Sequence, residues 1–197
     1  MKLLILDRDG TLNRNRDDYV ASPDEWEALP SALEAVARLN QGGWRVVLAT
    51  NQSGLGRGAF DMAALNAVHT KLHRQLLAVG GRVEAIFFCP HAPEDGCDCR
   101  KPAPGLFRQI GERFGVDLAG VPAAGHALRH VQAAAAVGCP AHLLLAGQAD
   151  HSLGLPQGLL AQCPPGVRSH ESLPAFVDWL LVQSNAGASR TAALSKP

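Results

Sequence analysis

Short, continuous apolar runs alternate along this chain with longer segments whose apolar residues recur at helical spacing. Each run predicts a strand buried on both faces, and the runs are residues 3–6, 44–49, 83–88, 121–125, 141–146 and 167–170. The intervening helical patterns cover residues 31–40, 62–79, 104–114, 132–138 and 173–182. This alternation predicts an α/β fold with a doubly wound, mainly parallel sheet.

The pattern also indicates how the chain is divided. No segment between the runs is long enough for a separate large cap domain, so we expect one domain over residues 1–183. Residues 184–197 are rich in Ser and Ala and lack an apolar face. We therefore expect a disordered tail over residues 184–197.

The first apolar run ends abruptly in two carboxylates, Asp7 and Asp9, followed by Gly10. Such residues are costly to place at the end of a buried strand, and in open α/β sheets that end is where ligands bind. Residues two apart on an extended chain point the same way, so the pair can face one pocket. One carboxylate can attack a phosphoryl group while the other transfers protons. The alternative is an ordinary solvated turn.

Polar residues also follow the second run, in Thr50-Asn51-Gln52-Ser53, and a glycine-rich stretch containing Arg57 comes next. A hydroxyl with the following backbone N–H groups can hold a phosphate, although a flexible loop is the alternative. The polar segment 13–26 leaves directly from the aspartate pair and carries Arg16 and Tyr19. We expect it to contact the substrate rather than to be a solvated connection.

Four residues of ligand type, Cys89, His91, Cys97 and Cys99, lie within eleven positions. Three thiolates and one imidazole form a complete tetrahedral ligand set for structural Zn²⁺; the alternative is a loop of reduced cysteines in which the histidine is incidental. Arg100 and Lys101 follow at once. A loop held by zinc would keep both cations in place for phosphate recognition.

Composition excludes several partners. The 197 residues contain 18 Lys+Arg and 18 Asp+Glu, so no large basic surface for nucleic acid is expected. No apolar run approaches the roughly 20 residues of a membrane helix, and the chain enters its first strand without a signal-peptide pattern. We expect a cytoplasmic monomer without a nucleic-acid or membrane partner.

The motifs at the strand ends resemble those of the haloacid dehalogenase superfamily of phosphatases. Asp7-x-Asp9-Gly-Thr is similar to its first motif, Thr50-Asn51-Gln-Ser to its second and Lys101-Pro to its third. The resemblance implies a Rossmann-like fold of that superfamily, with Asp7 as nucleophile and Asp9 as general acid and base. It further implies that Thr50, Asn51 and Lys101 stabilise the phosphoryl group, and that Asp7 and the Asp9 carbonyl help to hold Mg²⁺.

The cysteine-rich insert and the Cys-Arg-Lys-Pro string narrow the resemblance, over about residues 2–182, to the family of heptose bisphosphate phosphatases, close to histidinol-phosphate phosphatases. That family implies a phosphorylated sugar as substrate and hydrolysis of the 7-phosphate of a heptose 1,7-bisphosphate, on the route to lipopolysaccharide. Motif content leaves histidinol phosphate open. The substrate contacts implied are Arg16, Tyr19, Asn51, Gln52, Ser53, Arg57 and Arg100.

One motif departs from the superfamily. After the fourth run the superfamily carries an Asp and, four residues later, a second Asp, whereas this chain has His126 and His130. Mg²⁺ favours oxygen ligands, and imidazole suits Zn²⁺, Mn²⁺, Co²⁺ or Ni²⁺ better. We expect a weakened Mg²⁺ site at Asp7, Asp9 and His126, or another divalent ion there. Impaired catalysis, or a pseudo-enzyme that binds phosphorylated ligands without turnover, is the alternative.

Overall fold

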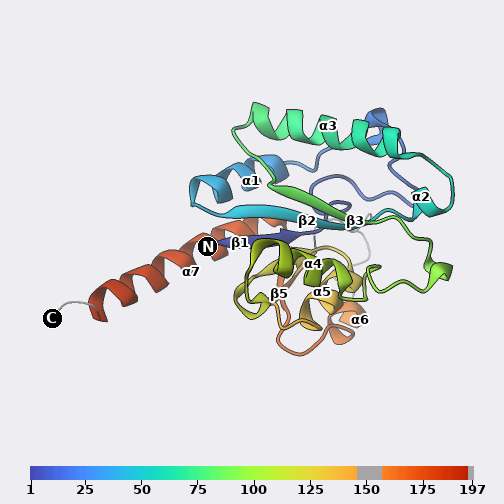
Figure 1. Cartoon of the computed structure of the whole chain (residues 1–197). Helices are drawn as coiled ribbons and strands as arrows, with labels where there is room; N and C mark the ends of the chain where they lie inside the picture. Colours follow the sequence, from blue (N-terminus) through green and yellow to red (C-terminus); the bar gives the residue numbers. More distant parts are fainter. Residues whose placement is uncertain (146–156, 195–197) are drawn as a thin grey trace.

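A parallel sheet forms the centre of the protein, whose computed structural model describes residues 1–145 and 157–194 (Figure 1). The sheet has six strands in the order β3-β2-β1-β4-β5-β6, and every neighbouring pair is parallel. The strands are β1 (Leu3–Leu6), β2 (Arg45–Asn51), β3 (Ala85–Cys89), β4 (Ala123–Gly125), β5 (Ala141–Leu144) and β6 (Arg168–His170). This architecture confirms the predicted fold class. Residue 146, the last of the fifth predicted run, lies outside the described residues.

Helices cover both faces of the sheet (Figure 1). They are α1 (Ala32–Gln41), α2 (Ser53–Gly56), α3 (Met62–Ala78), α4 (Gly105–Phe114), α5 (Leu128–Ala135), α6 (Gln157–Ala161) and α7 (Leu173–Leu194). Because side chains alternate along a strand, Leu4 and Leu6 of β1 pack with α1, α3 and α7, whereas Leu3 and Ile5 pack with α4 and α5. The central strand is therefore buried on both sides.

Strand order changes direction at β1. The chain runs from β1 through β2 to β3 on one side and then crosses to β4 on the other. In doubly wound sheets such a switch point opens a crevice beyond the carboxyl ends of the strands. Asp7 follows β1 and His126 follows β4, and the backbone N–H of Asp7 donates to the carbonyl of Ala124 (3.1 Å). The topology thus brings the first motif and the altered fourth motif to one place.

The end of the chain differs from expectation. Helix α7 continues through Leu194 and its far end projects from the body of the protein (Figure 1), where we had expected a disordered tail over residues 184–197. Alanine has the highest helix propensity, and extending an existing packed helix avoids the cost of nucleation. Residues 195–197 lie outside the described residues. That residues 1–183 form one domain stays a prediction.

Membrane insertion of a helix finds no support in the described residues. None of their helices combines the length and apolar character that a bilayer crossing requires.

Phe176 provides a test of how firmly α7 is packed. Its side chain is fully buried, and its ring centroid lies 4.8 Å from that of His142 on β5. We predict that Phe176→Ala lowers the free energy of unfolding by about 3–5 kcal/mol, because the truncation leaves a cavity. Urea denaturation followed by circular dichroism measures this loss. Val182→Ala, at a position of the same helix that is 63% exposed, should change it by less than about 0.5 kcal/mol. A loss below about 1 kcal/mol for Phe176→Ala would contradict this packing.

Candidate active site

A buried ion pair lies at the carboxyl end of β1. The Asp7 carboxylate contacts the Lys101 ammonium, with Oδ1 2.7 Å from Nζ, and both side chains are almost completely buried. Lys101 Nζ also donates to the carbonyl of Ala49 (2.6 Å) and lies 3.1 Å from Nδ1 of His130. An ammonium has three protons and no acceptor, so these three partners account for all of them. His130 therefore accepts at Nδ1, which requires a neutral imidazole.

Electrostatics keep the pair charged. Burial by itself would raise the pKa of the Asp7 carboxyl, but the positive charge of Lys101 holds that pKa well below its usual value. Burial lowers the pKa of the Lys101 ammonium, and Asp7 opposes that shift. Burial and the charge of Lys101 lower the pKa of His130 to about 3. Asp7 is thus ionised at neutral pH, the state that a carboxylate nucleophile needs.

Asp9 lies in a network of donors. The guanidinium of Arg8, whose side chain is buried, donates from Nη2 to both carboxylate oxygens (2.7 and 2.9 Å). The side-chain amides of Asn13 and Gln52 donate to the same group at 3.0 Å each, and the Thr50 hydroxyl lies 3.5 Å away. About a quarter of the Asp9 side chain remains exposed. Asp9 is therefore oriented by fixed partners and still reaches solvent, as an acid-base group must.

Asn51 holds the loop that carries Lys101. Its side-chain amide donates to the carbonyl of Lys101, and its Oδ1 accepts from the backbone N–H of Lys101, both at 3.0 Å. The peptide bond between Lys101 and Pro102 is cis. The second and third motifs are thus joined directly, and Asn51 positions the lysine in addition to any contact with substrate.

A cavity of about 370 Å³ opens at this end of the sheet. Its lining includes seven of the residues that the sequence predicted to be catalytic or substrate-binding: Asp9, Arg16, Tyr19, Asn51, Gln52, Ser53 and Arg100. Arg57 does not line it, but donates from Nη1 to the Tyr19 hydroxyl (3.3 Å). Asp7, Thr50 and Lys101 are buried at the strand ends. A larger cavity of about 750 Å³ near α2 has a mainly apolar lining that includes neither Asp7 nor Asp9, so its chemistry does not suit a phosphate.

Sequence reasoning missed two arginines of this site. Arg8 lies between the two aspartates in sequence and is fully buried through its pairing with Asp9. Arg129 lines the cavity, lies directly before His130 in α5, and forms no hydrogen bond or ion pair with the described residues. Both arginines occupy variable positions of the first and fourth motifs, so the motif patterns do not specify them. Their place inside these motifs was the only signal in the sequence.

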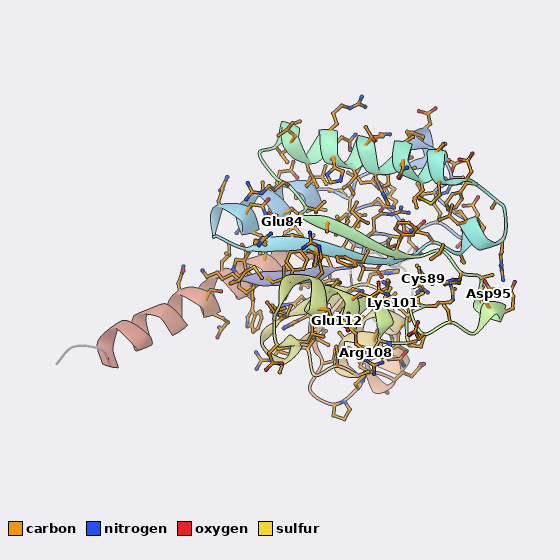
Figure 2. All side chains as sticks on the ribbon, viewed as in Figure 1. Glu84, Cys89, Asp95, Lys101, Arg108 and Glu112 are labelled. Atoms are coloured by element: carbon orange, nitrogen blue, oxygen red, sulfur yellow. The ribbon has the colours of Figure 1, made fainter. Side chains whose placement is uncertain are left out.

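The predicted zinc ligands converge. One ligand atom from each of Cys89, His91, Cys97 and Cys99 lies within 4.8 Å of the others, and three thiols with one imidazole suit tetrahedral Zn²⁺. The loop that carries them projects from the end of the sheet, with Asp95 at its outer part (Figure 2). This cluster therefore fits the predicted structural zinc.

The same loop supports the second motif. The backbone N–H of Gln52 donates to the carbonyl of Cys89 (2.8 Å). The backbone N–H of Gly56 donates to the carbonyl of Pro90 (2.9 Å). A Cβ added at Gly56 would lie 2.7 Å from the backbone nitrogen of Ala92, so only glycine allows this close approach. Zinc bound at the cluster would thus hold both the residues that follow β2, which contain the second motif, and the segment that leads to Lys101.

His126 makes the fit to Mg²⁺ poor. Its ring lies against Gly10, where an added Cβ would come within 2.6 Å of Nδ1, and that Nδ1 is buried without a partner among the described residues. Oδ1 of Asp7 already accepts from Lys101 and from the backbone N–H of Arg8 (2.9 Å). Mg²⁺ demands oxygen ligands in near-octahedral geometry, and an imidazole nitrogen suits transition ions better.

Comparisons with known proteins agree with this geometry. The family described as polynucleotide kinase 3 phosphatase matches residues 2–121. The D-glycero-beta-D-manno-heptose-1,7-bisphosphate 7-phosphatase of Bordetella bronchiseptica is 56% identical over 184 residues, which cover 93% of this chain and 100% of the relative. The protein of the same name from Pseudomonas aeruginosa is 51% identical over 160 residues, covering 80% of this chain and 90% of the relative.

Solved structures point the same way. The D,D-heptose 1,7-bisphosphate phosphatase of Bordetella bronchiseptica, complexed with magnesium and phosphate, is 55% identical, with a TM-score of 0.86 over 93% of this chain and 99% of that one. The D,D-heptose 1,7-bisphosphate phosphatase of Burkholderia thailandensis is 47% identical, with a TM-score of 0.69 over 91% of this chain and 99% of that one.

Removal of one zinc ligand tests the cluster. We predict that Cys99→Ser lowers the zinc content of the purified protein from one equivalent to a small fraction and lowers its melting temperature, because structural zinc contributes directly to folding free energy. Elemental analysis and thermal denaturation measure both effects. Cys163→Ser, which replaces a thiol outside the cluster, should leave zinc content unchanged. Equal zinc content in the two variants would contradict the assignment.

Proposed function

Because this chain belongs to the family of the D-glycero-D-manno-heptose 1,7-bisphosphate 7-phosphatases, we propose that it hydrolyses the 7-phosphate of D-glycero-beta-D-manno-heptose 1,7-bisphosphate. The observation that carries the proposal is the buried Asp7–Lys101 pair beside Asp9, at the switch point of the sheet. This pair combines an ionised carboxylate with a fixed positive charge where a phosphoryl group would arrive. The substrate is the one named for the relatives.

The first chemical step is assigned to Asp7. Its Oδ1 accepts from Lys101 and from the backbone of Arg8, whereas its Oδ2 accepts no hydrogen bond from the described residues. Oδ2 is therefore the oxygen that attacks phosphorus, and an aspartyl-phosphate forms as the sugar oxygen leaves. Asp9 enters this step protonated and gives its proton to that leaving oxygen. Lys101 acts as a fixed charge that offsets the negative charge of the transferring group.

The second step returns the enzyme to its starting state. Asp9, now ionised, takes a proton from water, and the water oxygen attacks the phosphorus of the aspartyl-phosphate. The bond to Asp7 breaks and inorganic phosphate leaves. Thr50 and Gln52 contact Asp9 (3.5 and 3.0 Å), so they hold it in place for both proton transfers.

The rest of the substrate is assigned to the cavity. Arg16 and Arg100 line it, and Arg57 reaches it through Tyr19. These cations suit the phosphorylated sugar that remains bound outside the reaction centre. Ser53 opens α2 at the edge of the cavity, where its hydroxyl and backbone can contact the phosphate to be removed.

We further propose that the protein works as a cytoplasmic monomer on the route to lipopolysaccharide heptose. None of its five cysteines forms a disulfide, and a reducing compartment keeps cysteines in that state. The route is that of the heptose bisphosphate handled by the relatives. A balanced charge of 18 Lys+Arg against 18 Asp+Glu supports the absence of a nucleic-acid partner.

A pseudo-enzyme is the second candidate, favoured by one observation: His126 and His130 occupy the fourth motif, and His126 fits Mg²⁺ poorly. In that case the chain would bind phosphorylated sugars without hydrolysing them. The intact pairs around Asp7 and Asp9 favour retained catalysis instead.

Nucleophile removal tests the proposed reaction. We predict that Asp7→Asn lowers kcat on heptose 1,7-bisphosphate by at least about 1,000-fold, because the amide cannot form the aspartyl-phosphate. Release of inorganic phosphate measures turnover, with several divalent ions and with histidinol phosphate as competing substrate. Asp117→Asn replaces an exposed aspartate outside the cavity and should keep full activity. A preference for histidinol phosphate would overturn the substrate assignment, and an active Asp7→Asn would overturn the mechanism.

Restoring carboxylates tests the metal site. We predict that the double variant His126→Asp, His130→Asp binds Mg²⁺ about 10–100-fold more tightly than the unmodified protein, because oxygen ligands replace nitrogen. Calorimetric titration of Mg²⁺ measures affinity independently of turnover, and Mg²⁺-dependent turnover should rise in parallel. Micromolar Mg²⁺ affinity in the unmodified protein would contradict the poor fit. Turnover that exists only in the double variant would establish the pseudo-enzyme.

A further inference from the structure

Most charges around the cavity are already paired. Asp9 pairs with Arg8 (2.7 Å), Asp18 with Arg16 (2.8 Å), and Asp7 with Lys101 beneath them (2.7 Å). Arg100 and Arg129 also line the cavity and form no ion pair among the described residues, and Asp17 is the remaining acid of the lining. The site therefore carries an excess of positive charge before any cation is added, which favours an anion.

Arg129 lies beside the reaction centre. Arg129 extends from the first turn of α5, and His130, the next residue, contacts Lys101. Arg129 is exposed and without a partner among the described residues, so its guanidinium is free to bind an oxyanion in a bidentate manner.

His126 adds an unused buried nitrogen. Its Nδ1 has no hydrogen-bond partner among the described residues, although the side chain is nine-tenths buried. Its ring lies against Gly10, the residue directly after Asp9. His126 does not line the cavity, and an imidazole at this position adds no negative charge to the site. A carboxylate at this position would instead repel a phosphate, unless a cation lay between them.

We propose that this site binds a phosphate dianion without a divalent cation. In this proposal Arg129, together with Lys101, takes over the neutralisation that a metal ion would supply, and His126 removes the negative charge that a carboxylate would place there. The proposal rests on the phosphate site of the proposed function but concerns binding rather than turnover. It follows from two features of this chain. Histidines stand at the two positions where carboxylates would need a metal ion, and Arg129 has no acid partner among the described residues.

Phosphate titration provides the test. The zinc-loaded protein is titrated calorimetrically with inorganic phosphate in buffer freed of divalent ions, and retained zinc is checked by elemental analysis. We expect binding there, with a Kd that changes less than about twofold when Mg²⁺ is added. Arg129→Gln should weaken binding by about tenfold or more, because it removes a charge-assisted contact. Arg108→Gln, at an exposed arginine of α4 outside the cavity (Figure 2), should not.

The variant His126→Asp gives the opposite signature. Its phosphate binding should weaken about tenfold or more without divalent ions and recover when Mg²⁺ is added. Phosphate binding of the unmodified protein only with Mg²⁺, or no binding in either buffer, would overturn the proposal, as would equal effects of Arg129→Gln and Arg108→Gln. Circular dichroism confirms that each variant is folded. If phosphate binds but heptose bisphosphate is not hydrolysed, the proposed function fails while this inference stands.

Discussion

The buried ion pair between Asp7 and Lys101 is the interaction on which the rest of the site depends. Burying two charges is costly, and the cost is recovered only if the pair has good geometry and its remaining donors are satisfied. Here the carbonyl of Ala49 and Nδ1 of His130 take the other protons of Lys101. Strands β1 and β2, the loop before α4, and α5 must therefore all be in place for the pair to be tolerated.

Two further arrangements serve this pair. Asn51 joins the end of β2 to the backbone of Lys101, and the carbonyls of Cys89 and Pro90 hold the residues that follow β2. The cluster of Cys89, His91, Cys97 and Cys99 is thus connected to both sides of the candidate active site, although none of the four touches Asp7 or Asp9 within the described residues. A small protein without a large cap domain can in this way keep its active-site loops in one arrangement.

The altered fourth motif changes the charge of the site more than its shape. His130 accepts from Lys101 as a carboxylate would, so all three protons of the lysine have partners. What is lost is negative charge, and with it the oxygen ligands that Mg²⁺ prefers. The relative from Bordetella bronchiseptica was solved with magnesium and phosphate; in this chain the positive charge of Arg129 is available at the same edge of the sheet.

The parallel sheet, the aspartate pair and the group of possible zinc ligands could all be predicted from local sequence patterns. A strand buried on both faces needs an uninterrupted apolar run, and polar residues at its end stand out against that run, as Asp7 and Thr50 do. Four ligand-type residues in a short loop are similarly conspicuous. Local sequence was less informative for residues 184–194, because propensity and an existing helix outweighed the missing apolar face.

The pairing of side chains in the site could not be predicted from the sequence, because it depends on the folded arrangement. Arg8 is buried against Asp9, and Asn51 holds the loop that carries Lys101. Arg129 is unpaired within the described residues, and Arg57 lies outside the cavity lining. The contact of Asn51 joins residues 50 positions apart in sequence, and the directions of Arg129 and Arg57 depend on how α5 and α2 pack. Hydrogen bonds and ion pairs act over a few ångströms, and such distances are set by the packing of whole elements rather than by the spacing of residues along the chain.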